Sequence, residues 1–227
     1  MMHYLKSGSL LLLLFLAACG SPYRKLKPME ADSLQVLEPF RFQPQFNDGA
    51  TILYRCHVDG RFLLKKFHLS GILLFRDMPD GGRNTRAVFT NEMGASLFDF
   101  GWKINANGRD SFQVYSIVEQ LNKPALIKTL RKDLELMLVR DLNDVKLFSG
   151  NGNFYYRSKL ENGYAYYILD GRTKALNRIE IAGKKRVASI FQIGKGRDDD
   201  FADSLSFVHN KAHFSINAKR IHNAGTE

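Results

Sequence analysis

The chain has 227 residues, a size that suits one large β domain and excludes a mini-protein held together by disulfides. Hydrophobic residues make up 44% and charged residues 25%, as in an ordinary globular protein, and two cysteines exclude a cysteine-rich metal site. The aromatic content of 12% favours β structure. The net charge of +10 comes from scattered basic residues, which indicates a solvated surface and no nucleic-acid partner.

The first 18 residues have the pattern of a signal peptide. The apolar run from Leu10 to Leu16 is too short to span a bilayer, and it leads into Leu16-Ala17-Ala18-Cys19. Small residues before a cysteine admit a peptidase, and the thiol of Cys19 can then be acylated. This stretch resembles a bacterial lipobox, which implies palmitate-type acyl chains on Cys19 and a lipid anchor. An ordinary secretory signal that happens to contain a cysteine is the alternative.

Four parts of the chain are predicted. Residues 1–18 form the signal peptide, 19–33 a polar tether, 34–222 a single domain and 223–227 a C-terminal tail. No stretch inside the domain has the composition of a linker, and no internal repeat is found.

The domain is predicted to be mainly β, with ten to eleven antiparallel strands. Apolar residues recur at every second position, which is typical of a sheet with one covered face. Connections are short, so neighbouring strands should be antiparallel. The pair Asp59-Gly60 predicts a hairpin turn between strands at 51–58 and 61–69.

One amphipathic helix is predicted from Pro124 to Asp141, with Asn122 as its N-cap. Asp133 is placed with the polar residues of this helix. The apolar stripe repeats at helical spacing and consists of Leu126, Leu130, Leu134, Met137 and Leu138. Two interpretations stay open, because the stripe can be simple core packing or can form a lid over a cavity.

No motif for catalysis, for a cofactor or for a metal ion is found, so we expect no enzyme. His209, His213 and His222 are isolated and are expected at the surface. Cys56 is expected to be buried and unreactive.

The order of lipobox, tether, antiparallel strands, amphipathic helix and further strands resembles the LolA/LolB family of lipoprotein carriers. The nearest members are the lipid-anchored outer-membrane receptors of the LolB type, which carry Thr-Asn-Pro-Leu-Gly between two strands. Here the corresponding residues are Thr90-Asn91-Glu92-Met93-Gly94. The resemblance implies that Met93, between Glu92 and Gly94, projects from its loop and takes part in membrane insertion.

The resemblance also implies an incomplete antiparallel β-barrel that is closed by the helix and holds acyl chains in an apolar cavity. It implies an acylated lipoprotein or lipid as cargo, a soluble periplasmic carrier as partner, and the periplasmic face of the outer membrane as location. Plain core packing is the alternative for each candidate lining residue. The candidates are Leu73, Phe75, Phe89, Phe98, Phe100, Val114, Leu130, Leu134, Ile179, Ile181, Phe191 and Phe214.

Two functions therefore stay open at this point. The first is a lipid-anchored acceptor that binds acyl chains and inserts lipoproteins into the outer membrane. The second is a non-catalytic docking lipoprotein of a cell-envelope assembly, with a filled barrel. An apolar void of roughly several hundred Å³ would favour the first.

Overall fold

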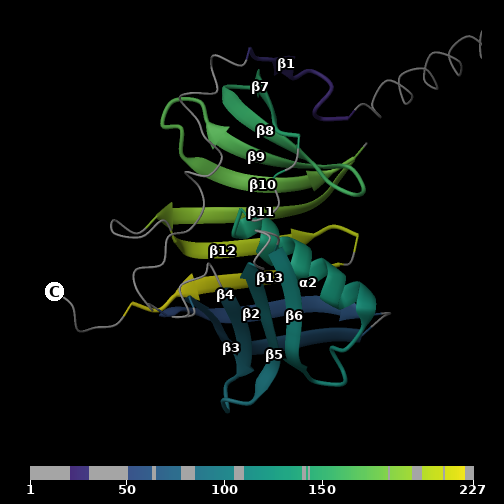
Figure 1. Ribbon diagram of the computed structural model, residues 1–227, viewed down its shortest axis with the longest axis vertical. Helices are drawn as coiled ribbons and strands as arrows, with labels where there is room; N and C mark the ends of the chain where they lie inside the picture. Colours follow the sequence, from purple (N-terminus) through teal and green to yellow (C-terminus); the bar gives the residue numbers. More distant parts are fainter. Residues whose placement is uncertain are drawn as a thin grey trace, which may run out of the picture.

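The computed structural model describes residues 21–30, 51–62, 65–77, 85–104, 110–139, 142, 144–183, 185–195, 201–211 and 213–222. Within these residues the chain forms one sheet of thirteen antiparallel strands and one α-helix (Figure 1). The sheet is strongly curved and its two outermost strands are not paired with each other. The prediction of an incomplete antiparallel barrel with one helix is confirmed, although the described residues form thirteen strands and not the ten to eleven predicted.

The elements in chain order are β1 (Lys27–Pro28), β2 (Thr51–Phe62), β3 (Lys65–Asp77), β4 (Thr85–Asn91), β5 (Ser96–Ile104), β6 (Asp110–Ile117), α2 (Pro124–Met137), β7 (Lys146–Gly150), β8 (Asn153–Lys159), β9 (Tyr164–Asp170), β10 (Leu176–Ala182), β11 (Arg186–Lys195), β12 (Ala202–His209) and β13 (Phe214–Arg220).

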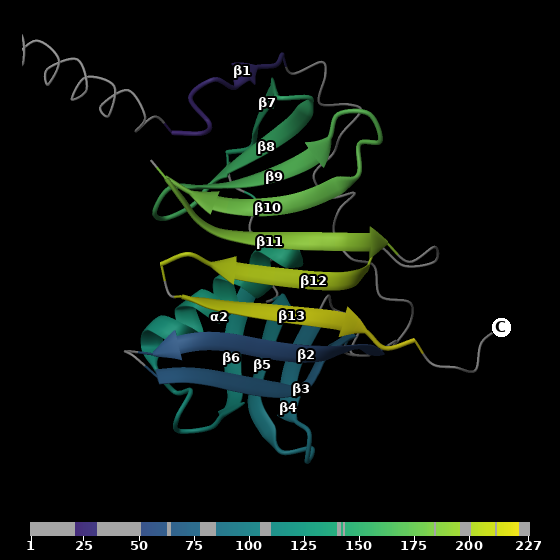
Figure 2. The same cartoon turned by 180° about the vertical axis from the view of Figure 1, so that it is seen from behind.

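The strand order explains where the helix lies. The order in the sheet is β1-β7-β8-β9-β10-β11-β12-β13-β2-β3-β4-β5-β6. The chain runs outward from β2 to the edge strand β6, crosses through α2 to β7 near the opposite edge, and returns strand by strand to β13 beside β2. The helix therefore lies inside the curve of the sheet (Figures 1 and 2).

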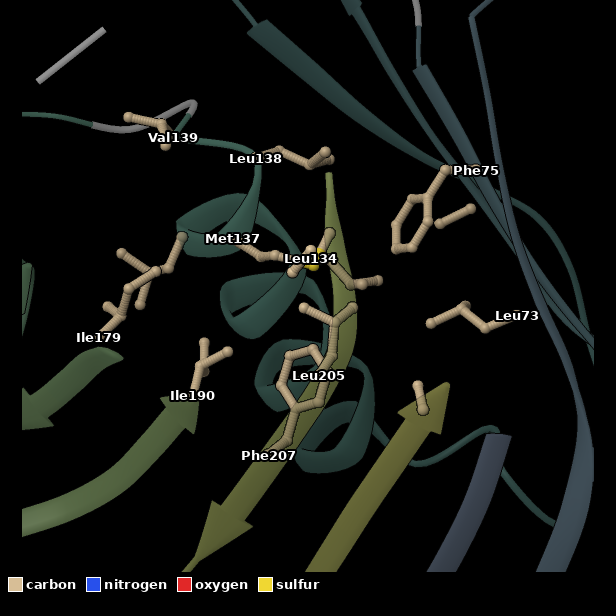
Figure 3. Packing of buried hydrophobic residues seen from close by; sticks show 14 of the residues in the cluster. Leu73, Phe75, Leu134, Met137, Leu138, Val139, Ile179, Ile190, Leu205 and Phe207 are labelled. Atoms are coloured by element: carbon tan, nitrogen blue, oxygen red, sulfur yellow. The ribbon is translucent and has the colours of Figure 1, made fainter. Parts of the chain in front are cut away.

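The core fills the space between α2 and the inner face of the sheet. Leu134 and Met137 of α2 point into this space, where Ile190 and Leu205 approach from one part of the sheet and Leu73 from another (Figure 3). All five side chains are buried. The apolar stripe thus finds its partner on the concave face, where its area is removed from water.

The pair Asp59-Gly60 does not form the predicted turn. It lies inside β2, where Asp59 is opposite His68 and Gly60 is opposite Phe67 of β3. A Cβ on Gly60 would lie 2.2 Å from Cζ of Phe67. Gly60 therefore lets the ring of Phe67 pack close to the backbone of β2. The pair forms part of a strand in spite of its turn propensity.

The helix differs from its prediction at both ends. It begins at Pro124, as expected, but Lys123 and not Asn122 is the N-cap, and no side chain caps it. It ends at Met137, earlier than predicted. Val139 has a φ of 52°, which takes the backbone out of the helical region.

Residues 21–30, part of the segment expected to be a tether, pack on the outer face of the sheet. The ring of Tyr23 stacks on Tyr166 with centroids 3.9 Å apart, and its hydroxyl donates a hydrogen bond to the carboxylate of Glu180. β1 pairs with β7 at the edge of the sheet. Cys19 lies outside the described residues, two positions before this docked segment.

The pKa of Glu180 responds to this docking. Burial of the carboxyl raises its pKa, but hydrogen bonds from Tyr23 and Arg178, the charge of Arg178 and a hydrogen bond from Arg186 outweigh burial and lower it. The two arginines lie 2.7 Å and 3.2 Å from Oε1. The ionised form of Glu180 therefore helps to hold residues 21–30.

We expect Tyr23→Phe to loosen residues 21–30, because it removes the bond to Glu180 and keeps the stacked ring. Amide hydrogen exchange in this segment should be about tenfold faster than in the wild type, as for the loss of a charge-assisted bond. Because the folded-state pKa of Glu180 is lowered, its contribution is present above its ordinary pKa of 4.5 and is lost as the pH falls through the folded-state value. The difference between the two proteins should therefore vanish in acid.

The control for this substitution is Tyr115→Phe, at an exposed tyrosine on β6. It should leave exchange in residues 21–30 unchanged. Equal exchange rates for Tyr23→Phe and wild type at neutral pH would contradict the docking contact.

Gly71 offers a second test of the fold. A Cβ at this position in β3 would lie 1.8 Å from the carbonyl oxygen of Thr90 in β4, so Gly71→Ala forces the backbone apart. We expect the free energy of unfolding to fall by about 1–3 kcal/mol, as in overpacked cores. Gly183→Ala, with nothing within 4 Å of its Cβ, is the control and should be near neutral. Urea unfolding measures both, and equal midpoints would refute the close approach.

Candidate functional site

An apolar cavity of about 110 Å³ lies between α2 and the inner face of the sheet. The segment before α2, α2 itself and strands β2, β3, β4, β5, β12 and β13 contribute its lining. The lining residues are Cys56, Val58, Phe67, Leu69, Leu73, Phe89, Phe98, Leu121, Leu126, Leu130, Asp133, Leu134, Phe207, Phe214 and Ile216.

The volume of this cavity is below the range of ordinary ligand pockets, which hold about 300–1,000 Å³. The C-terminal half of α2 accounts for the missing space, since Leu136, Met137 and Leu138 are buried in the core. The N-terminal half roofs the cavity through Leu126 and Leu130. Both interpretations of the helix therefore apply, because its last residues are core whereas Leu126, Leu130 and Leu134 border the void.

One side of the cavity is accessible. Phe67, near the start of β3, is 38% exposed although its ring faces the cavity. Leu121 and Leu126 at the start of the helix are partly exposed, as is Phe214 on β13. These four apolar side chains mark the mouth.

Asp133 is not with the polar residues of the helix, as the sequence analysis had it, but is buried in the cavity wall with 2% exposure. It follows Leu126 by seven residues, about two helical turns, and precedes Met137 by four, about one turn, so all three lie on one face of the helix. His209, expected at the surface, is also buried. Its Nε2 lies 2.6 Å from Oδ2 of Asp133.

The second oxygen of this carboxylate, Oδ1, is buried and has no hydrogen-bond partner among the described residues. Burial raises the pKa of Asp133, and the hydrogen bond and charge of His209, with the charge of Lys132, oppose that rise. The ring of His209 stacks on Phe214 with centroids 4.3 Å apart, which fixes its orientation.

Further polar contacts hold the helix on the sheet. Nε1 of Trp102 donates to Oε1 of Glu135 at 3.0 Å, and Nε of Arg131 donates to the same oxygen at 2.7 Å. The hydroxyl of Tyr167 donates to the backbone oxygen of Leu136 at 3.0 Å. The same oxygen also accepts the backbone N–H of Val139 at 3.2 Å, so the hydroxyl adds a second donor at the end of the helix.

The structure places the twelve predicted lining residues in three groups. Those that line the cavity are Leu73, Phe89, Phe98, Leu130, Leu134 and Phe214. Those that are buried elsewhere in the core are Phe75, Phe100, Ile179 and Ile181. Two lie outside it, Val114 and Phe191.

Val114 is 41% exposed on the edge strand β6. Phe191 pairs with Arg178 and Ser206 on the outer face, because its neighbour Ile190 occupies the inner face of β11. Phe191 was therefore wrongly predicted to line the cavity, since the inner position of this pair belongs to Ile190.

Sequence reasoning missed nine lining residues. The alternation within β2, β3, β12 and β13 could have found Cys56, Val58, Leu69, Phe207 and Ile216, and helical spacing could have found Asp133. No pattern in the sequence indicates that Leu121 and Phe67 lie at the mouth of the cavity, because the position of the mouth depends on the curvature of the sheet.

Met93 is 90% exposed at the turn between β4 and β5. Oδ1 of Asn91 accepts a hydrogen bond from the backbone N–H of Met93 at 3.0 Å, and Gly94 has a φ of 82°. These two residues set the turn and leave the methionine without a packing partner. The carboxylate of Glu92 accepts a hydrogen bond from the hydroxyl of Ser70 at 2.5 Å.

None of the helices described is both long enough and apolar enough to cross a membrane. No group of three or more histidine, cysteine, aspartate or glutamate side chains in the described part of the chain could hold a metal ion.

No family model matches the sequence, and no curated protein matches it. Among solved structures, a domain from Vibrio parahaemolyticus described as an outer membrane lipoprotein-sorting protein aligns with a TM-score of 0.51 and 11% identity, over 87% of this chain and 95% of its own. A DUF1329 family protein from Desulfovibrio piger aligns with a TM-score of 0.47 and 9% identity, over 88% and 95% of the two chains. A LolA superfamily protein from Nitrosomonas europaea aligns with a TM-score of 0.43 and 5% identity, over 83% and 91%.

The likeness to the lipoprotein-sorting domain concerns the fold. At 11% identity and a TM-score of 0.51, the two chains share an overall fold.

Cys56 provides a probe of the cavity wall. The thiol is 2% exposed, as expected from the sequence, and burial raises its pKa to about 12. Since the thiolate is the reactive form, alkylation by iodoacetamide at pH 8 should be at least about a hundredfold slower in the folded protein than in urea. A Val58→Cys variant in a Cys56→Ala background places the thiol at a partly exposed position of the same wall and should react faster. Rapid modification of native Cys56 would contradict its burial in the cavity wall.

Proposed function

We propose that this protein is a lipid-anchored protein of the periplasmic face of the outer membrane that binds acyl chains beneath α2. In the manner of LolB-type receptors, it would accept lipoproteins from a soluble periplasmic carrier and pass them to the membrane. The observation that carries the proposal is the apolar cavity with an accessible mouth, in a fold shared with a lipoprotein-sorting domain.

The lining supports the binding of hydrocarbon. Leu73, Phe89, Phe98 and Leu130 present only carbon atoms to the void. An acyl chain that leaves water for such a surface gains about 0.8 kcal/mol for each buried methylene. Transfer from one carrier to another needs only a difference in how well each cavity receives the chain, and no chemical step.

The anchor would attach at one end of the molecule. Acylation of Cys19 would place lipid two residues before the docked segment 21–30, which lies near β1 at one end of the long axis (Figure 1). The turn that carries Met93 lies toward the other end. The lipid on Cys19 and the side chain of Met93 can reach the same bilayer when the long axis of the molecule is parallel to the membrane.

Met93 is suited to touch lipid. Its thioether is flexible and apolar, and its side chain is almost fully exposed on a turn held by Asn91 and Gly94. In the proposed function, Met93 enters the membrane during insertion of the cargo. Glu92 is directed to Ser70 by a hydrogen bond, so its carboxylate is tied to the sheet.

A second candidate is favoured by the volume of the cavity. At about 110 Å³ the void is too small for a whole acyl chain as it stands. A protein whose barrel stays filled would act as a docking lipoprotein in an envelope assembly, and a partner would bind at an exposed sheet edge.

Filling the remaining void separates these functions. Leu130→Trp places an indole in the roof of the cavity, so we expect about tenfold less co-purified acyl lipid than with the full-length wild-type chain. Cells that carry only this variant should leave lipoproteins outside the outer-membrane fraction. Extraction with mass spectrometry and membrane fractionation measure the two effects.

Ala125→Trp is the matched control, because Ala125 is exposed on the same helix and outside the lining. It should leave lipid content and lipoprotein location unchanged. A wild-type protein that carries no lipid but co-purifies with one envelope protein would favour the docking function and refute the carrier.

A further inference from the structure

The outer face of β13, β2 and β3 carries a group of basic side chains. Because side chains alternate along a strand, the residues between the buried ones point away from the core and from α2. Five exposed cations take such positions, and the strand order brings them together on the side of the sheet that Figure 2 shows. These residues, which we call the basic face, are Arg55, Arg61, Lys66, Arg76 and Lys219.

Two pairs of these cations lie directly opposite each other. Arg55 of β2 is opposite Lys219 of β13. Arg61 of β2 is opposite Lys66 of β3. Like charges in this position repel each other and destabilise a sheet. The fold therefore brings positive charges together at a cost, which an anion bound on this face would offset.

The described part of the chain does not supply that anion. None of the five cations forms an ion pair with a described residue. Asp59 points to the same side of β2, but its carboxylate pairs with Nδ1 of His68 at 2.8 Å. Asp99 on β5 pairs with Arg86. Among the described side chains of β2, β3 and β13, no carboxylate on this face remains for the five cations, which favours an anionic partner.

The basic face lies on the side of the molecule where the proposed membrane contacts are. Residues 21–30, which follow Cys19 closely, pack on the outer face of the same sheet, and Figure 2 shows the strands from β9 to β13, β2 and β3 following one another down this side. Met93 adjoins it as well, because the neighbouring Glu92 accepts a hydrogen bond from Ser70 of β3. An acyl anchor, the basic face and Met93 can therefore meet one surface.

We propose that the basic face binds the surface of a phospholipid leaflet that contains anionic headgroups. The lipid phosphates supply the negative charge that the sheet lacks, and exposed lysine and arginine side chains are attracted to such a surface over about a Debye length. The attraction orients the anchored protein with its basic face on the lipid and α2 on the side away from the membrane, where a soluble carrier can reach it. This inference rests on the proposed lipid anchor and names the class of lipid on which the protein lies.

Lysine acetylation on vesicles tests this orientation. The full acylated chain, purified from membranes in detergent, is diluted into preformed vesicles of phosphatidylcholine alone or of an equal mixture of phosphatidylcholine and phosphatidylglycerol. Vesicles with bound protein are isolated by flotation and treated with sulfosuccinimidyl acetate, which does not cross the bilayer. Mass spectrometry then gives the acetylation rate of each lysine.

We expect Lys66 and Lys219 to react about tenfold more slowly on the anionic vesicles than on the neutral ones, because a few cations suffice to hold this face against anionic lipid. High ionic strength should remove the difference, since salt screens the attraction while the acyl anchor keeps the protein on the vesicles. Lys128, which is exposed on α2, should react equally on both kinds of vesicle.

A double variant, Arg55→Gln with Lys219→Gln, weakens the face and leaves Lys66 as the reporter. The protection of Lys66 on anionic vesicles should fall from about tenfold to about twofold. Urea unfolding should show no loss of stability, because the two residues repel each other in the wild type. The matched control is Lys123→Gln with Arg172→Gln, which removes the same charge from exposed positions outside the basic face and should keep the tenfold protection.

The outcomes separate this inference from the anchor on which it rests. Equal acetylation of Lys66 on both kinds of vesicle would overturn the basic face as a lipid site and leave it open to an acidic protein. Protection of Lys128 in place of Lys66 would also overturn it, since α2 would then face the lipid, and so would full protection of Lys66 in the Arg55→Gln, Lys219→Gln variant. A chain that does not float with neutral vesicles lacks the anchor and contradicts that part of the proposed function, whereas its binding to anionic vesicles with Lys66 protected would still support the basic face.

Discussion

The structure depends on one constraint, the burial of the apolar stripe of α2. The helix joins β6 at one edge of the sheet to β7 near the other, and among the described residues the larger apolar cluster lies on the concave side. A sheet that curves around a helix needs no second sheet to cover its inner face. The helix α2 does not fill all the space on the concave side of the sheet, and the cavity is the part that it leaves empty.

Apolar packing alone would allow α2 to rotate about its own axis, since one hydrocarbon contact can replace another with little change in free energy. Polar contacts remove that freedom. Asp133 reaches His209 on β12, Glu135 reaches Trp102 on β5, and the hydroxyl of Tyr167 on β9 meets the end of the helix. A buried donor or acceptor that loses its partner costs about 1–3 kcal/mol, so a rotated helix would lose stability at each of these contacts. These contacts therefore fix one orientation, and with it which side chains face the void.

Periodicity was sufficient to predict the class of the fold, because alternation in strands and the helical stripe both follow from which face is buried. It failed where one residue depends on distant parts of the sheet. The pair Asp59-Gly60 was predicted to form a turn, but it lies in a strand where Gly60 packs against Phe67. Phe191 was assigned to the wrong face of the sheet because Ile190 and Phe191 are both apolar. The spacing of Asp133 in the sequence places it on the buried face of the helix, but its charge led to the prediction that its side chain is exposed to solvent. Only the presence of His209 on a strand far along the chain explains its burial.

The two halves of α2 differ in how firmly they are held. The C-terminal half is buried and bonded to Tyr167, whereas the first turn has no side-chain cap and Leu126 is partly exposed. Local opening follows the pattern of burial and hydrogen bonding, so the first turn is the part of the helix that opens at the lowest cost. Phe67 is exposed beside it. In the proposed function, a ligand larger than the present void would displace this turn first, because the rest of the helix is held by burial and by the bond to Tyr167.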